Sequence, residues 1–93
     1  MITHIVALTL TDPDDSYECV DRLQALVPRI AEIDSLAAGV DIVESNTSAH
    51  VGLVTTHADL GALKAYQAHA AHQDFLAWLG PRLAARTVVD FES

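Results

Sequence analysis

The sequence has little of several features that mark whole classes of protein. Its single cysteine, Cys19, excludes an internal disulfide, so we expect a reducing, cytoplasmic environment. Only five lysines and arginines oppose 13 acidic residues, which leaves a net charge of −8. A chain this acidic repels nucleic acid and anionic membranes, so we expect neither as a partner.

Long apolar runs are also missing. No stretch approaches the roughly 20 apolar residues that a helix needs to cross a bilayer, and the first residues lack the basic-then-apolar pattern of a signal peptide. Repeats, linkers and low-complexity tracts are absent as well. We therefore expect one domain over residues 1–93, without a membrane segment.

Apolar side chains, in contrast, are abundant. Hydrophobic residues make up 51% of the chain. A lone domain of this length buries only about 60–65% of its unfolded surface, which is too little to hide so much apolar material. The excess predicts an interface between subunits, and we expect a homodimer.

The first half of the chain predicts a strand, a helix and a second strand. Residues 2–10 alternate, and the bulkier even side, which includes His4, should face the core. The acidic residues and serine at 14–16 offer oxygens that cap a helix, which should run to about Val27, before Pro28. Residues 36–44 form the next predicted strand.

The second half predicts a strand over residues 49–56, which pairs with 36–44 as a hairpin. A helix capped by Asp59 should bend near residues 68–70 and run to about Ala84, unless Gly80-Pro81 ends it earlier. Residues 86–92 form the last strand. The order β-α-β-β-α-β is the ferredoxin-like α+β unit, with a four-stranded antiparallel sheet and both helices on one face. The bare face would then close against a second copy.

The segment Tyr66-Gln-Ala-His69-Ala-Ala-His72 carries the chemistry. His72 begins an apolar stripe at helical spacing, so its ring should point toward the core. Tyr66 lies about one turn before His69. Together with His4, these residues place imidazoles and a phenol against an apolar interior.

Three motifs in register carry a resemblance to a known family: Ile2-Thr-His4-Ile-Val, Tyr66-Gln-Ala-His69-Ala-Ala-His72-Gln, and Val88-Val-Asp90-Phe-Glu92. Over essentially its whole length the chain resembles the stress-responsive dimeric A/B barrel (Dabb) domain family, within the dimeric α+β barrel group. The resemblance implies a homodimer whose two sheets form a central barrel with the helices outside. Each subunit can hold a cavity between its own sheet and helices.

The best-defined activity in that family is a plant polyketide cyclase, which performs an intramolecular aldol cyclisation without a cofactor. The resemblance implies that His4 and His72 are acid/base residues and that Tyr66 occupies a pocket position. The chain departs from that enzyme at Leu23, near which it has a pocket tyrosine, and at His69-Ala-Ala-His72, where the family has His-Pro-Ala-His. Other members are stress-induced proteins with no assigned catalysis.

An aldol or enolisation step needs a base for the proton next to a carbonyl and a donor for the enolate oxygen. Our hypothesis makes His72 the base, with His4 orienting it or donating to the oxyanion, and Tyr66 adding a hydroxyl. The ligand would be a small hydrophobic carbonyl compound, and no cofactor or metal is required. The alternative is a non-catalytic stress-response or scaffold dimer, in which His4 and His72 bond each other across a filled core.

The remaining polar candidates have simpler interpretations. A metal shared by His69 and His72 would lack enough further ligands. We expect His69 to face solvent or cap a helix. His50 and His57 should lie at the surface or rim.

Overall fold

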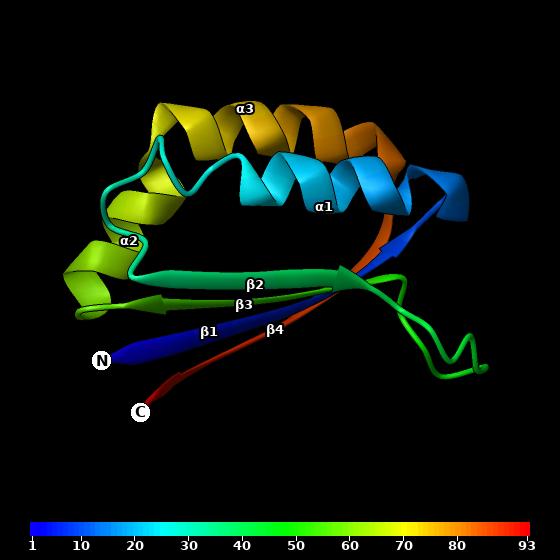
Figure 1. Ribbon diagram of the computed structural model, residues 1–93, viewed down its shortest axis with the longest axis horizontal. Coiled ribbons are helices and arrows are strands. Elements are labelled where there is room, and N and C mark those ends of the chain that lie inside the picture. The colour runs from blue at the N-terminus through cyan, green and yellow to red at the C-terminus, as the bar shows by residue number, and fades with distance from the viewer.

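A computed structural model describes all residues, 1–93, and Figure 1 shows its elements. The chain order confirms the predicted α+β class, with the second helix divided in two. The elements are β1 (Ile2–Leu10), η1 (Pro13–Asp15), α1 (Ser16–Gln24), β2 (Ser35–Val40), β3 (Val51–His57), α2 (Leu60–Ala68), α3 (Ala70–Leu79), η2 (Gly80–Arg82) and β4 (Leu83–Glu92).

The four strands form one antiparallel sheet in the order β2-β3-β1-β4. All helices lie on one side of it, and both termini lie at the same end (Figure 1). From His4, at 5% exposure, to Leu10 the even positions of β1 are buried, while Ile2 and the odd positions are half-buried. The predicted orientation of His4 toward the helix-covered core is therefore confirmed.

The first helix ends earlier than the sequence predicts. α1 stops at Gln24, and the following turns are held in place by Ile30 and Ile33, which are buried. Asp15, one of the expected cap residues, is the N-cap of α1 but makes no side-chain cap hydrogen bond. The cap bond forms one turn earlier, at η1, where Asp12 Oδ1 accepts the backbone N–H of Asp14 at 2.9 Å. Aspartate is a strong cap because its carboxylate satisfies a helix N–H that has no partner within the turn.

The second helical segment contains the predicted bend. Asp59 Oδ1 accepts the Ala62 N–H at 2.8 Å and begins α2. His69 then adopts extended backbone, and its Nδ1 accepts the Ala71 N–H at 3.0 Å, which caps α3. The capping interpretation of His69 is thus confirmed.

The end of α3 is the earlier of the two that the sequence allows. The helix stops at Leu79, and Gly80-Pro81 forms a short 3₁₀ turn that leads into β4 at Leu83. Extension to Ala84 was therefore wrong. Proline has no N–H to continue the helical ladder, and its ring clashes with the preceding turn.

The core lies between the sheet and the helices and contains 15 buried apolar residues. Trp78 closes it on the outside, held between the guanidinium groups of Arg22 and Arg82 at 4.7 and 4.6 Å from its ring centroid. The opposite face of the sheet has no cover, and Val89 and Phe91 there are 52% and 45% exposed. None of the helices has the length and hydropathy needed to cross a membrane.

Candidate functional site

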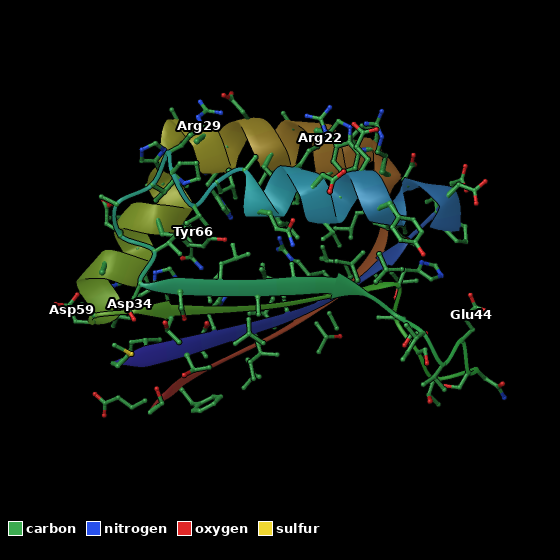
Figure 2. The ribbon with its side chains drawn as sticks, viewed as in Figure 1. Arg22, Arg29, Asp34, Glu44, Asp59 and Tyr66 are labelled. Atoms are coloured by element: carbon green, nitrogen blue, oxygen red, sulfur yellow. The ribbon has the colours of Figure 1, made fainter.

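Four aromatic side chains from separate elements meet between the sheet and the helix layer. His4 comes from β1, His57 from the end of β3, Tyr66 from α2 and His72 from α3. The Tyr66 ring centroid lies 6.2 Å from His4, 4.8 Å from His57 and 4.6 Å from His72. Figure 2 shows Tyr66 beside α2, in the space between the helices and the sheet. The fold therefore brings together all three predicted site residues.

His4 is oriented by a residue from the far end of the chain. Its Nδ1 donates to the Asp90 carboxylate, because β4 pairs with β1 in a register that sets Asp90 directly beside His4. His4 is buried, whereas the Asp90 side chain is 37% exposed. The carboxylate fixes the ring and its tautomer, and it leaves Nε2 free to act on a bound molecule. Sequence reasoning quoted Asp90 within a motif but gave it no role.

His72 is also held through its Nδ1, but by a backbone carbonyl instead of a carboxylate. Its Nδ1 donates to the Gln67 carbonyl oxygen at 3.1 Å, so the neutral ring carries its lone pair on Nε2. Burial lowers the pKa of His72 below its usual 6.5, while the hydrogen bond to Gln67 raises it; the electrostatic effects of His4 and Arg86 lower it further. His72 is thereby favoured as a neutral base at physiological pH.

Tyr66 brings a hydroxyl to the same space. The side chain is 1% exposed, and burial raises its pKa to about 12, so the phenol stays protonated. No hydrogen bond within the chain uses its hydroxyl, yet no fully enclosed side-chain oxygen lacks a partner. The Tyr66 hydroxyl must therefore reach open space in the cavity that it lines.

That cavity has a volume of about 230 Å³ and lies between β1, β4 and α3. His4, Tyr66 and His72 line it together with apolar side chains such as Val6, Phe75, Leu76 and Val88. Leu23, the position of the departure noted in the sequence, also faces it. The space is large enough for a small organic molecule, although it is below the usual range of drug-sized pockets, about 300–1,000 Å³.

A larger depression elsewhere does not contain the predicted chemistry. It measures about 610 Å³, lies between η1 and the loop before β3, and is lined mainly by polar side chains such as Asp14, Asp41 and Glu44. Neither His4, Tyr66 nor His72 borders it. Volume alone would favour this open depression, but the convergence of acid/base groups favours the smaller cavity.

The expectation for His57 was wrong. Its ring is fully buried rather than at the rim. Nδ1 donates to the Glu32 carbonyl oxygen at 2.8 Å, and the Thr55 hydroxyl donates to Nε2 at 2.8 Å. Both nitrogens are satisfied, so His57 supports the cluster without a free atom for chemistry. His50 is half-buried, and its Nδ1 accepts the Leu10 N–H at 2.9 Å.

His4 and His72 are not hydrogen-bonded to each other, because each Nδ1 has a different partner. The direct His4–His72 hydrogen bond that the alternative included is therefore absent. No three histidine, cysteine or carboxylate side chains come together in a way that could hold a metal ion. Arg86 also lines the cavity, and nothing in the sequence indicated it, because its position depends on how β4 pairs with β1.

Comparison with known proteins supplies the family context. The model of a family described as Stress responsive A/B Barrel Domain matches residues 2–93. No curated protein matches the chain. Among solved structures, a dimeric ferredoxin-like protein of unknown function from Thermobifida fusca is similar at 28% identity and a TM-score of 0.87, over 99% of this chain and 90% of that one.

Two further structures extend this likeness. A dimeric ferredoxin-like protein of unknown function from Jannaschia shares 25% identity at a TM-score of 0.79, over 99% of this chain and 98% of that one. An antibiotic biosynthesis monooxygenase shares 15% identity at a TM-score of 0.77, over 100% of this chain and 98% of that one, which is a likeness of fold alone.

Proposed function

The chain belongs to the stress responsive A/B barrel domain family, and from that premise we propose that it is a homodimer whose subunits each bind a small hydrophobic carbonyl compound. Within the pocket, His72 and His4 perform cofactor-free acid/base chemistry of the enolisation or aldol type. The observation that carries the proposal is that both imidazoles are held by their Nδ1 atoms at the wall of one apolar cavity.

The proposed roles follow from the partners of each ring. His72 is the base, because its Nδ1–H is bound to a backbone carbonyl and its lowered pKa keeps Nε2 unprotonated at pH 7. His4, paired with the Asp90 carboxylate, accommodates a proton on Nε2 and donates it to the developing enolate oxygen. The Tyr66 hydroxyl, kept protonated by burial, is the second donor to that oxygen.

The uncovered face of the sheet supports the homodimer. That face points away from the cavity and carries exposed apolar side chains, among them Val54, Val89 and Phe91. Two copies that close these faces together would remove this surface from water, and the Thermobifida fusca and Jannaschia proteins are described as dimeric. Dimerisation through this face leaves the cavity on the outer, helix-covered side.

The test is exchange of an α-proton. We expect the protein to accelerate hydrogen–deuterium exchange next to the carbonyl of 4-phenyl-2-butanone, followed by NMR in deuterated buffer. His72→Gln should slow the catalysed exchange by roughly 10²–10⁴-fold, the usual contribution of a general base. His50→Gln is the matched control, because His50 lies outside the cavity.

Light scattering on the same samples completes the design. Wild type and both variants should be dimers at micromolar concentration, so that lost exchange cannot be attributed to lost assembly. A monodisperse monomer would contradict the homodimer. Exchange no faster than in buffer would contradict the acid/base chemistry, and full activity in His72→Gln would remove His72 from its role as the base.

A further inference from the structure

Arg86 has a location that neither the acid/base chemistry nor the packing of the core requires. Among the basic side chains, Arg22 and Arg82 have carboxylate partners, Glu18 at 2.8 Å and Asp15 at 3.9 Å. Arg86 forms no ion pair with any of the chain's 13 acidic residues. Arg29 and Lys64 also lack an ion pair, but of these three basic residues only Arg86 lines the cavity.

The register of β4 explains how Arg86 reaches the cavity. It pairs with Leu8 on β1, and in the same phase of the strand Val88 pairs with Val6 and Asp90 with His4. Side chains in one phase of a strand share a face, so Arg86 points to the helix-covered side, as Leu8 and His4 do. It lines the cavity at the edge of the sheet, while Asp90 lies four residues further along β4 and is already bound to His4.

The chemistry of this wall selects for one kind of ligand group. A guanidinium presents paired N–H donors whose spacing matches the two oxygens of a carboxylate, and it stays charged at any physiological pH. Arg86 is an exposed residue, but the rest of the lining is mainly apolar, so the side of an ion pair that faces the cavity is partly shielded from water. The acidic surface repels anions in general, so the permanent positive charge of Arg86 is the feature of the pocket wall that most favours a carboxylate.

We propose that the ligand of this pocket carries a carboxylate, which Arg86 binds at the β4 edge while the apolar part lies against Phe75, Leu76 and Val88. The inference rests on the proposed function and refines it, because it names the substrate class as a carboxylic acid with an apolar chain. Arg86 is thus a specificity-determining residue. The charge of Arg86 also contributes to lowering the His72 pKa, so the proposed carboxylate site lies within electrostatic reach of the proposed base.

Two probes of matched shape test the proposal: 4-phenylbutanoate and its uncharged analogue 4-phenylbutanamide. Both are titrated into the ¹⁵N-labelled dimer at fixed ionic strength, with the amide signals of Tyr66 and His72 as reporters of the cavity. We expect the carboxylate to bind roughly tenfold more tightly than the amide, because one hydrogen bond between charged groups contributes about that much affinity. In Arg86→Gln the two affinities should become equal within about twofold, through loss of carboxylate binding alone.

Arg29→Gln is the matched control. It changes the net charge by the same amount, but Arg29 lies on the outer side of the helix layer, as Figure 2 shows, and does not line the cavity. The tenfold preference should survive in this variant. Its loss in both variants would mean that the general charge of the protein, rather than Arg86, selects the carboxylate, and would overturn the proposal.

The outcomes separate this inference from the function on which it rests. Equal binding of the two probes to wild type, or an undiminished preference in Arg86→Gln, overturns the role of Arg86 and leaves the pocket in place. A tenfold preference combined with no α-proton exchange supports the carboxylate site and contradicts only the acid/base chemistry. No response of Tyr66 or His72 to either probe at millimolar concentration overturns both proposals.

Discussion

The two halves of the helix-covered face of the sheet are built differently. Under β2 and β3, polar groups are buried and fully paired: His57 bonds Thr55 and Glu32, and neither His57 nor Thr55 has any exposed surface. Along β1 and β4 the same kind of side chains border an open cavity, and β4 is exposed along nearly its whole length.

The difference shows that the bonding of the second ring nitrogen decides whether a buried histidine is structural or available to a ligand. His57 uses both nitrogens within the protein and is a structural residue. His4 and His72 each use only Nδ1, so Nε2 remains for a ligand. A buried polar group costs free energy unless it is hydrogen-bonded. This explains why the polar groups under β2 and β3, the filled half, are all hydrogen-bonded, whereas the unpaired nitrogens beside β1 and β4, the open half, lie at a cavity.

The comparison predicts the largest effect in the filled half. His57→Ala removes a buried ring and leaves the Thr55 hydroxyl and the Glu32 carbonyl without their partner, so the free energy of unfolding should fall by about 3 kcal/mol. His72→Ala, in the open half, should cost about 1 kcal/mol, the contribution of one ordinary hydrogen bond. Urea denaturation at equal protein concentration measures both, and equal losses would contradict the division into two halves.

A smaller effect comes from adding volume at two positions of α3. Ala71 is 1% exposed, so Ala71→Leu should overpack the core and cost about 1–3 kcal/mol. Leu76 is half-buried and lines the cavity, so Leu76→Phe should change stability by less than about 0.5 kcal/mol. Leu76→Phe should also weaken binding of 4-phenylbutanoate by filling its space. An equal stability cost at both positions would mean that the cavity is not open in solution.

The smallest effect is a dependence of stability on pH that arises from His72. His72 has a folded-state pKa below its usual 6.5, so unfolding takes up a proton in the window from about 6.5 down to that lowered pKa. Stability should therefore fall as the pH decreases through this window, since the unfolded state binds more protons there. The groups that face the ring, His4 and Arg86, disfavour its protonation, and the Gln67 carbonyl favours it.

Arg86→Gln sharpens this prediction, because loss of the nearby positive charge should raise the His72 pKa toward its usual value. An NMR titration of the His72 ring protons measures the pKa directly, and urea midpoints at pH 7.5 and 5.5 measure its share of stability against His72→Gln. A wild-type His72 that titrates at or above 6.5 would contradict the burial of its ring.

Much of the fold could be predicted from local pattern. Alternation in β1 predicted that His4 faces the core, and Asp59 indicated the start of α2. The bend was predicted near residues 68–70, where His69 caps α3. The end of α3 was less certain, because a Gly-Pro pair can be tolerated or can end a helix, and the surrounding packing decides between the two. The burial of His57 was missed, since the end of a strand gives no periodic signal of what covers it.

The sequence by itself determined which side chains point inward, because the periods of strand and helix are properties of the backbone that a few consecutive residues reveal. Only the tertiary structure decided which of them meet. His4 and Asp90 are 86 positions apart, and Arg86 reaches the cavity for the same reason: β4 pairs beside β1 in one register among several that the pattern allowed. That register is fixed by the packing of the whole sheet and the helices, which is a global property, and it alone turns three separate motifs into one pocket.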